Sequence, residues 1–64
     1  MNEIAYLAKK IGAYFILVSP TNLNPYWIID IRKNGTGLKI ESFRFETLEE
    51  LVDETVTYLK LVGG

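Results

Sequence analysis

The sequence predicts a small α+β domain, a three-stranded antiparallel meander with two helices in α-β-β-β-α order, the helices mainly on one face. The central observation is Asn34-Gly35, which separates two runs rich in β-branched and aromatic residues. Asn-Gly between such runs is the strongest short-range signal for a hairpin. Helical periodicity appears on both sides of the strand region, in residues 2–11 and again after Thr47.

Length and composition indicate one globular domain over residues 1–64. The chain is 48% hydrophobic and 23% charged, which is typical of a folded protein. It contains no Cys and no His, so neither a disulfide nor a zinc site is expected to support its small core. Self-association is the simplest remaining source of extra stability, and the first indication of a homodimer.

The first two elements are read from end signals and apolar spacing. Residues 2–11 predict a helix, because Glu3 lies in its first turn, Lys9 and Lys10 in its last, and Gly12 just beyond it. Its apolar positions have helical spacing and are Ile4, Leu7, Ala8 and Ile11. Residues 13–18 are apolar without alternation, so they predict a strand covered on both faces, which ends before Pro20.

The hairpin predicts a register if Asn34 and Gly35 are its two turn residues. Ile31 then lies opposite Leu38, Ile29 opposite Ile40, and Asp30 forms a cross-strand ion pair with Lys39. The predicted core residues of the hairpin are Trp27, Ile29, Ile31, Leu38 and Ile40. Phe43 and Phe45 have the opposite parity, which predicts a bulge near Ser42 or a strand end near Phe43.

The last helix is predicted to begin at a capping box. Thr47 and Glu50 have the spacing in which each side chain accepts a hydrogen bond from the other residue's backbone amide. One broad apolar stripe follows, formed by Leu48, Leu51, Val52, Thr55, Val56, Tyr58, Leu59 and Val62.

Catalytic chemistry is not indicated. Without His and Cys, the commonest acid-base group, nucleophile and metal ligand are missing. Residues 46–54 contain five acids and no base, and we interpret them as a solvated helix surface rather than a magnesium or acid-base site. Residues 33–37 lack the spacing of a phosphate loop. We therefore expect no enzyme, no cofactor and no metal.

The informative surface is the side of the hairpin turned away from Trp27, Ile29 and Ile31. It is too apolar for a solvated sheet, and a monomer rarely exposes a large apolar patch. The residues expected to form this interaction face are Tyr14, Ile16, Tyr26, Ile28 and Phe43. The first strand contributes either Tyr14, Ile16 and Val18 or Ala13, Phe15 and Leu17 to this face. A second copy, a partner protein or the first helix could cover it. We expect a non-catalytic protein-interaction or regulatory accessory module that forms a homodimer or binds a protein partner.

Nucleic-acid binding is the alternative. Arg32, Lys33, Lys39 and Arg44 lie on and beside the hairpin, and Tyr26 could stack on a base. A net charge of −1 argues against a strong general nucleic-acid binder.

Two short segments allow a comparison with known families. With the order helix, three strands, helix, residues 12–19 and 45–52 resemble the core of Src-homology phosphotyrosine-binding domains. That family places a phosphate-binding Arg in the first of these strands, and none of residues 14–19 is basic, so the resemblance implies the order of elements and not the activity. The same order resembles double-stranded-RNA-binding domains, and the strands and last helix resemble integrase arm-type DNA-binding domains.

The N-terminal residues predict no targeting signal, because no basic region precedes an apolar one. The apolar run at 13–18 is far shorter than a membrane span. We expect a soluble, cytoplasmic protein that does not bind membranes.

Overall fold

The computed structural model describes residues 2–63, which adopt the predicted order of elements. Helix α1 spans Asn2–Lys10 and helix α2 spans Leu48–Gly63. Strands β1 (Ala13–Val18), β2 (Trp27–Lys33) and β3 (Lys39–Phe45) form one antiparallel sheet in the order β1-β2-β3. The predicted fold class is confirmed.

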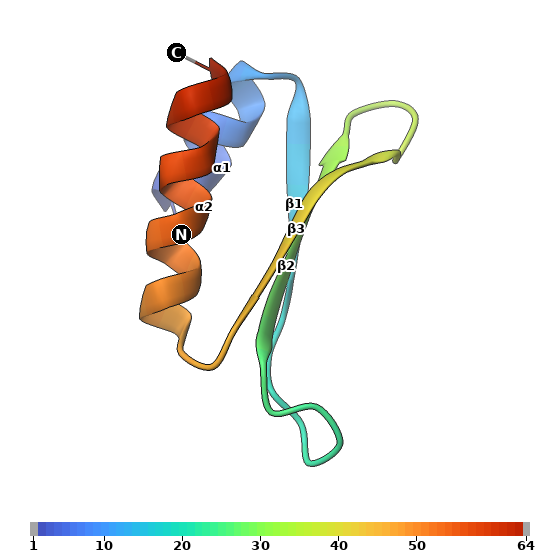
Figure 1. The fold of residues 1–64 in the computed structure, drawn as a ribbon. Coiled ribbons are helices and arrows are strands. Elements are labelled where there is room, and N and C mark those ends of the chain that lie inside the picture. The colour runs from blue at the N-terminus through green and yellow to red at the C-terminus, as the bar shows by residue number, and fades with distance from the viewer. Residues whose placement is uncertain (1, 64) are drawn as a thin grey trace.

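Both helices lie on the same side of the sheet (Figure 1). Helix α1 packs on β1 and against α2, while α2 packs on β2 and β3. No element among residues 2–63 covers the opposite side of the sheet (Figure 1). Helix α1 therefore does not cover the opposite side of the sheet. Of the three covers considered for the apolar residues on that side, a second copy and a partner protein are left.

The core lies between the helices and the helical side of β2. Ile29 and Ile31 are fully buried there, together with Ile4, Ala8, Ala13, Leu51 and Leu59. Thr55 is the buried polar residue, and its hydroxyl donates a hydrogen bond of 2.6 Å to the carbonyl of Leu51. A helical Thr satisfied by the preceding turn can be buried without leaving its hydroxyl unpaired.

The hairpin register predicted from Asn34-Gly35 is wrong. Ile29 lies opposite Phe43 and Ile31 opposite Glu41, and after a register shift Arg32 lies opposite Lys39. The predicted Asp30–Lys39 pair is also wrong, because Asp30 lies opposite Ser42.

Two features cause the difference, a longer turn and the one-residue register shift at Ile40. The Lys33 amide donates to the Leu38 carbonyl and the Gly37 amide donates to the Lys33 carbonyl, both at 2.9 Å. Positive φ occurs at Gly35 (84°) and Gly37 (72°) and at no described non-glycine residue, so Asn34 does not adopt the conformation of a type I′ turn.

This register moves apolar residues between the two faces. Leu38 and Ile40, predicted as core, are 67% and 40% exposed. Phe43 and Phe45 instead pack against the core, and the Phe43 ring meets the Tyr58 ring of α2 edge to face at 5.5 Å. The expected bulge near Ser42 is displaced, since the register shift leaves Ile40 without an opposite residue.

The predicted signals at the helix ends are largely confirmed. Gly12 follows α1 with a φ of 70°, the left-handed conformation that ends a helix. At the start of α2, the Glu50 amide donates to Thr47 Oγ1 (3.2 Å), as predicted. The second half of the capping box differs, because the Glu50 carboxylate accepts a hydrogen bond from the Thr47 hydroxyl (2.8 Å) rather than from the Thr47 amide.

Candidate interaction face

The uncovered side of the sheet, here called the open face, is defined by the alternation of side chains along β2. Because Ile29 and Ile31 are buried under the helices, Ile28, Asp30 and Arg32 point to the other side. Residues directly opposite one another across strands share a face. The open face therefore consists of Tyr14, Ile16 and Val18 from β1, Ile28, Asp30 and Arg32 from β2, and Lys39, Ser42 and Arg44 from β3.

One half of the open face is apolar. Tyr14, Ile16 and Val18 are 39%, 44% and 44% exposed, and they are successive outward residues of β1. Ile28 lies directly opposite Val18 and extends the apolar surface onto the central strand. Three aliphatic side chains and a tyrosine thus form one continuous exposed group rather than scattered single residues.

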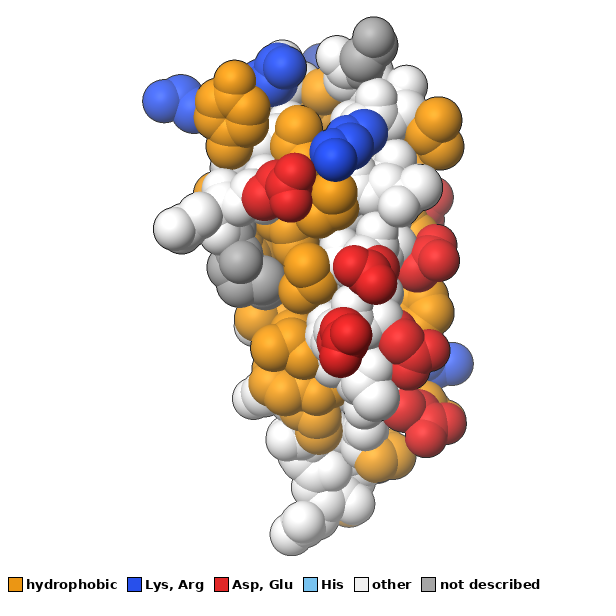
Figure 2. All heavy atoms as spheres, turned by 90° about the vertical axis from the view of Figure 1, so that its left-hand side faces the viewer, with side chains coloured by type: hydrophobic (Ala, Val, Ile, Leu, Met, Phe, Trp, Pro, Cys, Tyr) orange, Lys and Arg blue, Asp and Glu red, His pale blue; other side chains and the backbone are white. Residues whose placement is uncertain are grey.

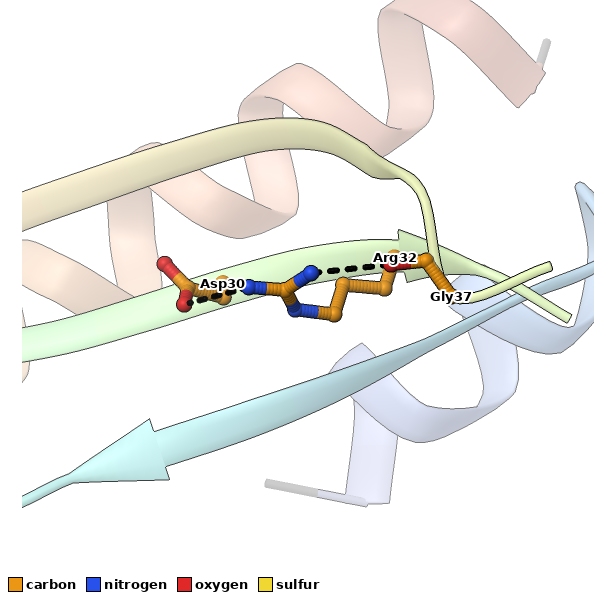
Figure 3. Close-up of polar contacts among 3 residues, drawn as sticks. All are labelled: Asp30, Arg32 and Gly37. Atoms are coloured by element: carbon orange, nitrogen blue, oxygen red, sulfur yellow. Dashed lines mark hydrogen bonds and ion pairs between the residues drawn. The ribbon is translucent and has the colours of Figure 1, made fainter.

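The centre of the open face is charged. Arg32 Nη2 lies 3.6 Å from a carboxylate oxygen of Asp30, two residues earlier on the same strand (Figure 3). Arg32 Nη1 also donates a 2.8 Å hydrogen bond to the carbonyl of Gly37 (Figure 3). Arg32 Nε is buried and makes no hydrogen bond within residues 2–63. The guanidinium is therefore held along β2 between Asp30 and the hairpin turn.

Four of the five residues predicted for the interaction face have positions consistent with it. Tyr14, Ile16 and Ile28 lie on the open face, and Tyr26 precedes β2 with the parity of Ile28. The Arg44 guanidinium lies over the Tyr26 ring, 4.9 Å from its centroid. The prediction that Phe43 belongs to the interaction face is wrong, because Phe43 packs on the helical side against Tyr58.

Val18 lies on the open face together with Tyr14 and Ile16, which is one of the two sets that the sequence left open for this strand. The run 13–18 has no polar residue to distinguish its two faces, so alternation could not assign them. The burial of Ala13 and the exposure of Tyr14 now settle which set faces outward.

The basic residues of the nucleic-acid alternative do not form one cluster. Arg32 and Lys39 lie opposite each other near the hairpin turn, and Lys33 follows Arg32. Arg44 is five residues farther along β3, roughly 16 Å away in an extended strand, and it contacts Tyr26. Arg32 is already paired with Asp30. Lys33 and Lys39 are therefore the exposed bases at the turn that have no ion pair among residues 2–63.

The acidic segment lies on the helical side of the molecule. Figure 2 shows acidic side chains in a column there, beside apolar side chains. Glu46, Glu49, Glu50, Asp53 and Glu54 are all exposed. Within residues 2–63 no group of three or more acidic side chains is arranged to hold a metal ion. In the same part of the chain, neither helix has the length and apolar character needed to cross a bilayer.

Comparisons with known proteins found no match: no family model, no curated protein and no solved structure is significantly similar to this chain.

Proposed function

We propose that this chain is a non-catalytic interaction module of the cytoplasm that forms a homodimer through its open face and serves a regulatory or accessory role. The observation that supports this proposal is the continuous apolar group of Tyr14, Ile16, Val18 and Ile28 on a side of the sheet that no helix within residues 2–63 covers. In water this group costs free energy, and burying it against a second copy recovers that free energy.

The charges of the open face favour a second copy over an unrelated apolar partner. Asp30 and Arg32 lie on the central strand, roughly 6.6 Å apart along it. In a two-fold interface, each contact occurs twice with the roles exchanged. An axis passing near Ile31 places Asp30 of each copy beside the partner's Arg32, so that neither of these two charges is buried without an opposite charge.

The size of the open face sets the expected strength of this association. Three strands about 4.8 Å apart and six residues about 3.3 Å apart cover an area of roughly 14 by 20 Å. Such a surface is smaller than the ~800 Å² that each partner buries in a standard interface. We therefore expect a reversible dimer with a dissociation constant in the micromolar range.

Light scattering after size exclusion, at loading concentrations from about 10 μM to 1 mM, tests the proposal. The apparent mass is expected to rise from monomer to dimer across this range. Ile16→Asp places a charge on the open face and is expected to keep the protein monomeric. Leu23→Asp is the matched control, because Leu23 is 98% exposed in the loop before β2, and it should dimerise normally. A monomer at every concentration would refute the homodimer.

Nucleic-acid binding remains the second proposal, supported by Lys33 and Lys39 at the hairpin turn. It predicts binding of single-stranded DNA or RNA that weakens steeply with salt. Arg32→Ala/Lys33→Ala should reduce that binding, whereas the control Lys9→Ala/Lys10→Ala removes equal charge from α1 and should not. If the first variant binds as well as the parent, or if neither binds, this proposal fails.

A further inference from the structure

The two edges of the sheet differ in how they are protected. The Asn34 amide donates to the Gly12 carbonyl at 2.9 Å, which continues the β1–β2 register by one residue. Because hydrogen-bonded pairs alternate in an antiparallel ladder, Tyr14, Ile16 and Val18 bond to β2. The amides and carbonyls of Ala13, Phe15 and Leu17 therefore point outward from the edge.

The edge formed by β3 is blocked. The same alternation directs the Ser42 and Arg44 amides outward, and the Ser42 amide is bound by the Glu41 carboxylate at 3.0 Å. The register shift at Ile40 adds an irregularity to this strand. A charged side chain and a bulge are two usual means of preventing an edge strand from pairing with another chain.

The edge formed by β1 has none of these protections. Residues 13–18 contain no charge, no proline and no register shift. A regular, uncharged, apolar edge strand is a template for another strand.

A hollow of about 370 Å³ runs beside this edge, between β1 and α1. Its wall is formed by Ala5, Ala8 and Lys9 of α1, and its floor by residues of β1 including Ala13 and Phe15. Leu7 and Lys10 line a different hollow with α2, so Ala5 and Lys9 lie on the side of α1 turned away from α2. The small alanines leave room for the side chains of a strand added next to β1.

We propose that the free edge of β1 binds an extended segment of a partner protein as a fourth strand, antiparallel to β1, with a carboxylate beside Lys9. Lys9 of α1 and Lys33, opposite Ala13, flank the same end of β1, and neither has an ion pair among residues 2–63. The C-terminal end of an antiparallel segment reaches this basic end, which favours a segment that ends in a carboxylate or carries Asp or Glu there.

A second copy of the chain fits this edge less well than an isolated segment. If β1 paired antiparallel with β1 of a second copy, its basic end would meet residues 18–24 of that copy, which contain no carboxylate. A segment with a carboxylate at this end is therefore the better match to Lys9 and Lys33. The edge site is separate from the open face, and a dimer formed through the open face leaves it uncovered.

The probe for this site is a library of eight-residue peptides with a free C-terminal carboxylate, randomised among Val, Ile, Leu, Thr and Tyr at the first seven positions. The readout is amide hydrogen exchange and ¹⁵N chemical shifts of the protein. Selected peptides are expected to slow exchange at Ala13, Phe15 and Leu17 by about tenfold or more. Amidation of the peptide, or Lys9→Ala, should weaken binding by roughly threefold if the terminal carboxylate meets Lys9. If the free-acid and amidated peptides bind equally, the terminal carboxylate does not contact Lys9. A peptide with an internal Asp or Glu then tests whether a side-chain carboxylate does.

Backbone N-methylation provides the matched variants, since a chain of 64 residues can be made by chemical synthesis. N-methylation of Phe15 removes one outward donor and should weaken peptide binding about tenfold, while N-methylation of Arg44 on the other edge should leave it unchanged. If the Phe15 form does not fold, Leu17 is the second site. Three results would each overturn the proposal. One is that the library yields no binding peptide. Another is that bound peptide slows amide exchange at Ser42 and Arg44 instead of at β1. The third is that the β1 amides become protected in concentrated protein without peptide. Ile28→Asp places a charge on the open face but on the central strand β2. It should abolish dimerisation and keep peptide binding at β1, so the failure of one site is distinguishable from the failure of the other.

Discussion

Asp30 and Arg32 form an ion pair of 3.6 Å along β2, in the middle of the sheet face opposite helices α1 and α2. The pair sits beside an apolar group from β1 and β2, and its two charges are arranged so that a two-fold axis near Ile31 exchanges them. In one copy the two charges neutralise each other, and in the proposed dimer each would lie beside the opposite charge of the second copy.

Reversing the charge of either residue is expected to convert the proposed homodimer into an obligate heterodimer. Asp30→Arg makes both positions basic and Arg32→Asp makes both acidic, so each variant alone repels its own copy. A mixture of the two should form a heterodimer, which native mass spectrometry detects. If each variant alone dimerises as the parent does, the charged centre is not in the interface.

The burial of Ile29 and the exposure of Ile40 predict very different costs for the same truncation. Ile29→Ala removes a fully buried side chain and should lower the free energy of unfolding by about 2–5 kcal/mol. Ile40→Ala, at a residue 40% exposed, should cost less than about 1 kcal/mol in a monomeric sample. Urea denaturation measures both, and equal costs would support the register expected from Asn34-Gly35 instead.

Thr47 should contribute to the stability of α2 through its hydroxyl. This group accepts the Glu50 amide and donates to the Glu50 carboxylate. Thr47→Ala loses both bonds and should cost ~0.5–2 kcal/mol, whereas Thr47→Ser retains them and should cost only a few tenths. The thermal unfolding midpoints of the two variants, measured at one protein concentration, check this difference. A Thr47→Ala variant as stable as the parent would contradict it.

Gly12 should be sensitive to substitution for backbone reasons alone. Its φ is 70°, and an added Cβ would have no atom within 4 Å. Gly12→Ala should therefore cost about 1–2 kcal/mol through strain and not through a clash. Gly12→Asn should cost less, because Asn tolerates this conformation better. An equal loss in both variants by urea denaturation would point to an unrecognised contact.

The sequence was sufficient for the elements because their signals are local. Gly12 and Thr47 mark helix ends through conformations or hydrogen bonds formed within a few residues. The apolar spacing of α1 and α2 also identified the faces that bury Ile4, Ala8, Leu51 and Leu59.

The register could not be predicted because it depends on the conformation of the turn. Asn34-Gly35 and Gly37 allow more than one turn, and the observed one uses positive φ at both glycines rather than at Asn34. The longer turn shifts the pairing by two residues, which keeps the faces, and the bulge at Ile40 shifts it by one more, which exchanges the faces of the residues that follow. Ile40 was therefore placed in the core and Phe43 outside it. The β2 residues of the open face were unaffected, since their side of the sheet follows from alternation within β2.

The most direct test of the homodimer is an isotope-filtered NOE experiment on an equal mixture of ¹³C-labelled and unlabelled protein at a concentration where dimer is expected. The account predicts intermolecular NOEs from the methyl groups of Ile16, Val18 and Ile28. Their absence, or intermolecular NOEs confined to other exposed apolar side chains such as Leu61 and Val62 at the end of α2, would contradict it.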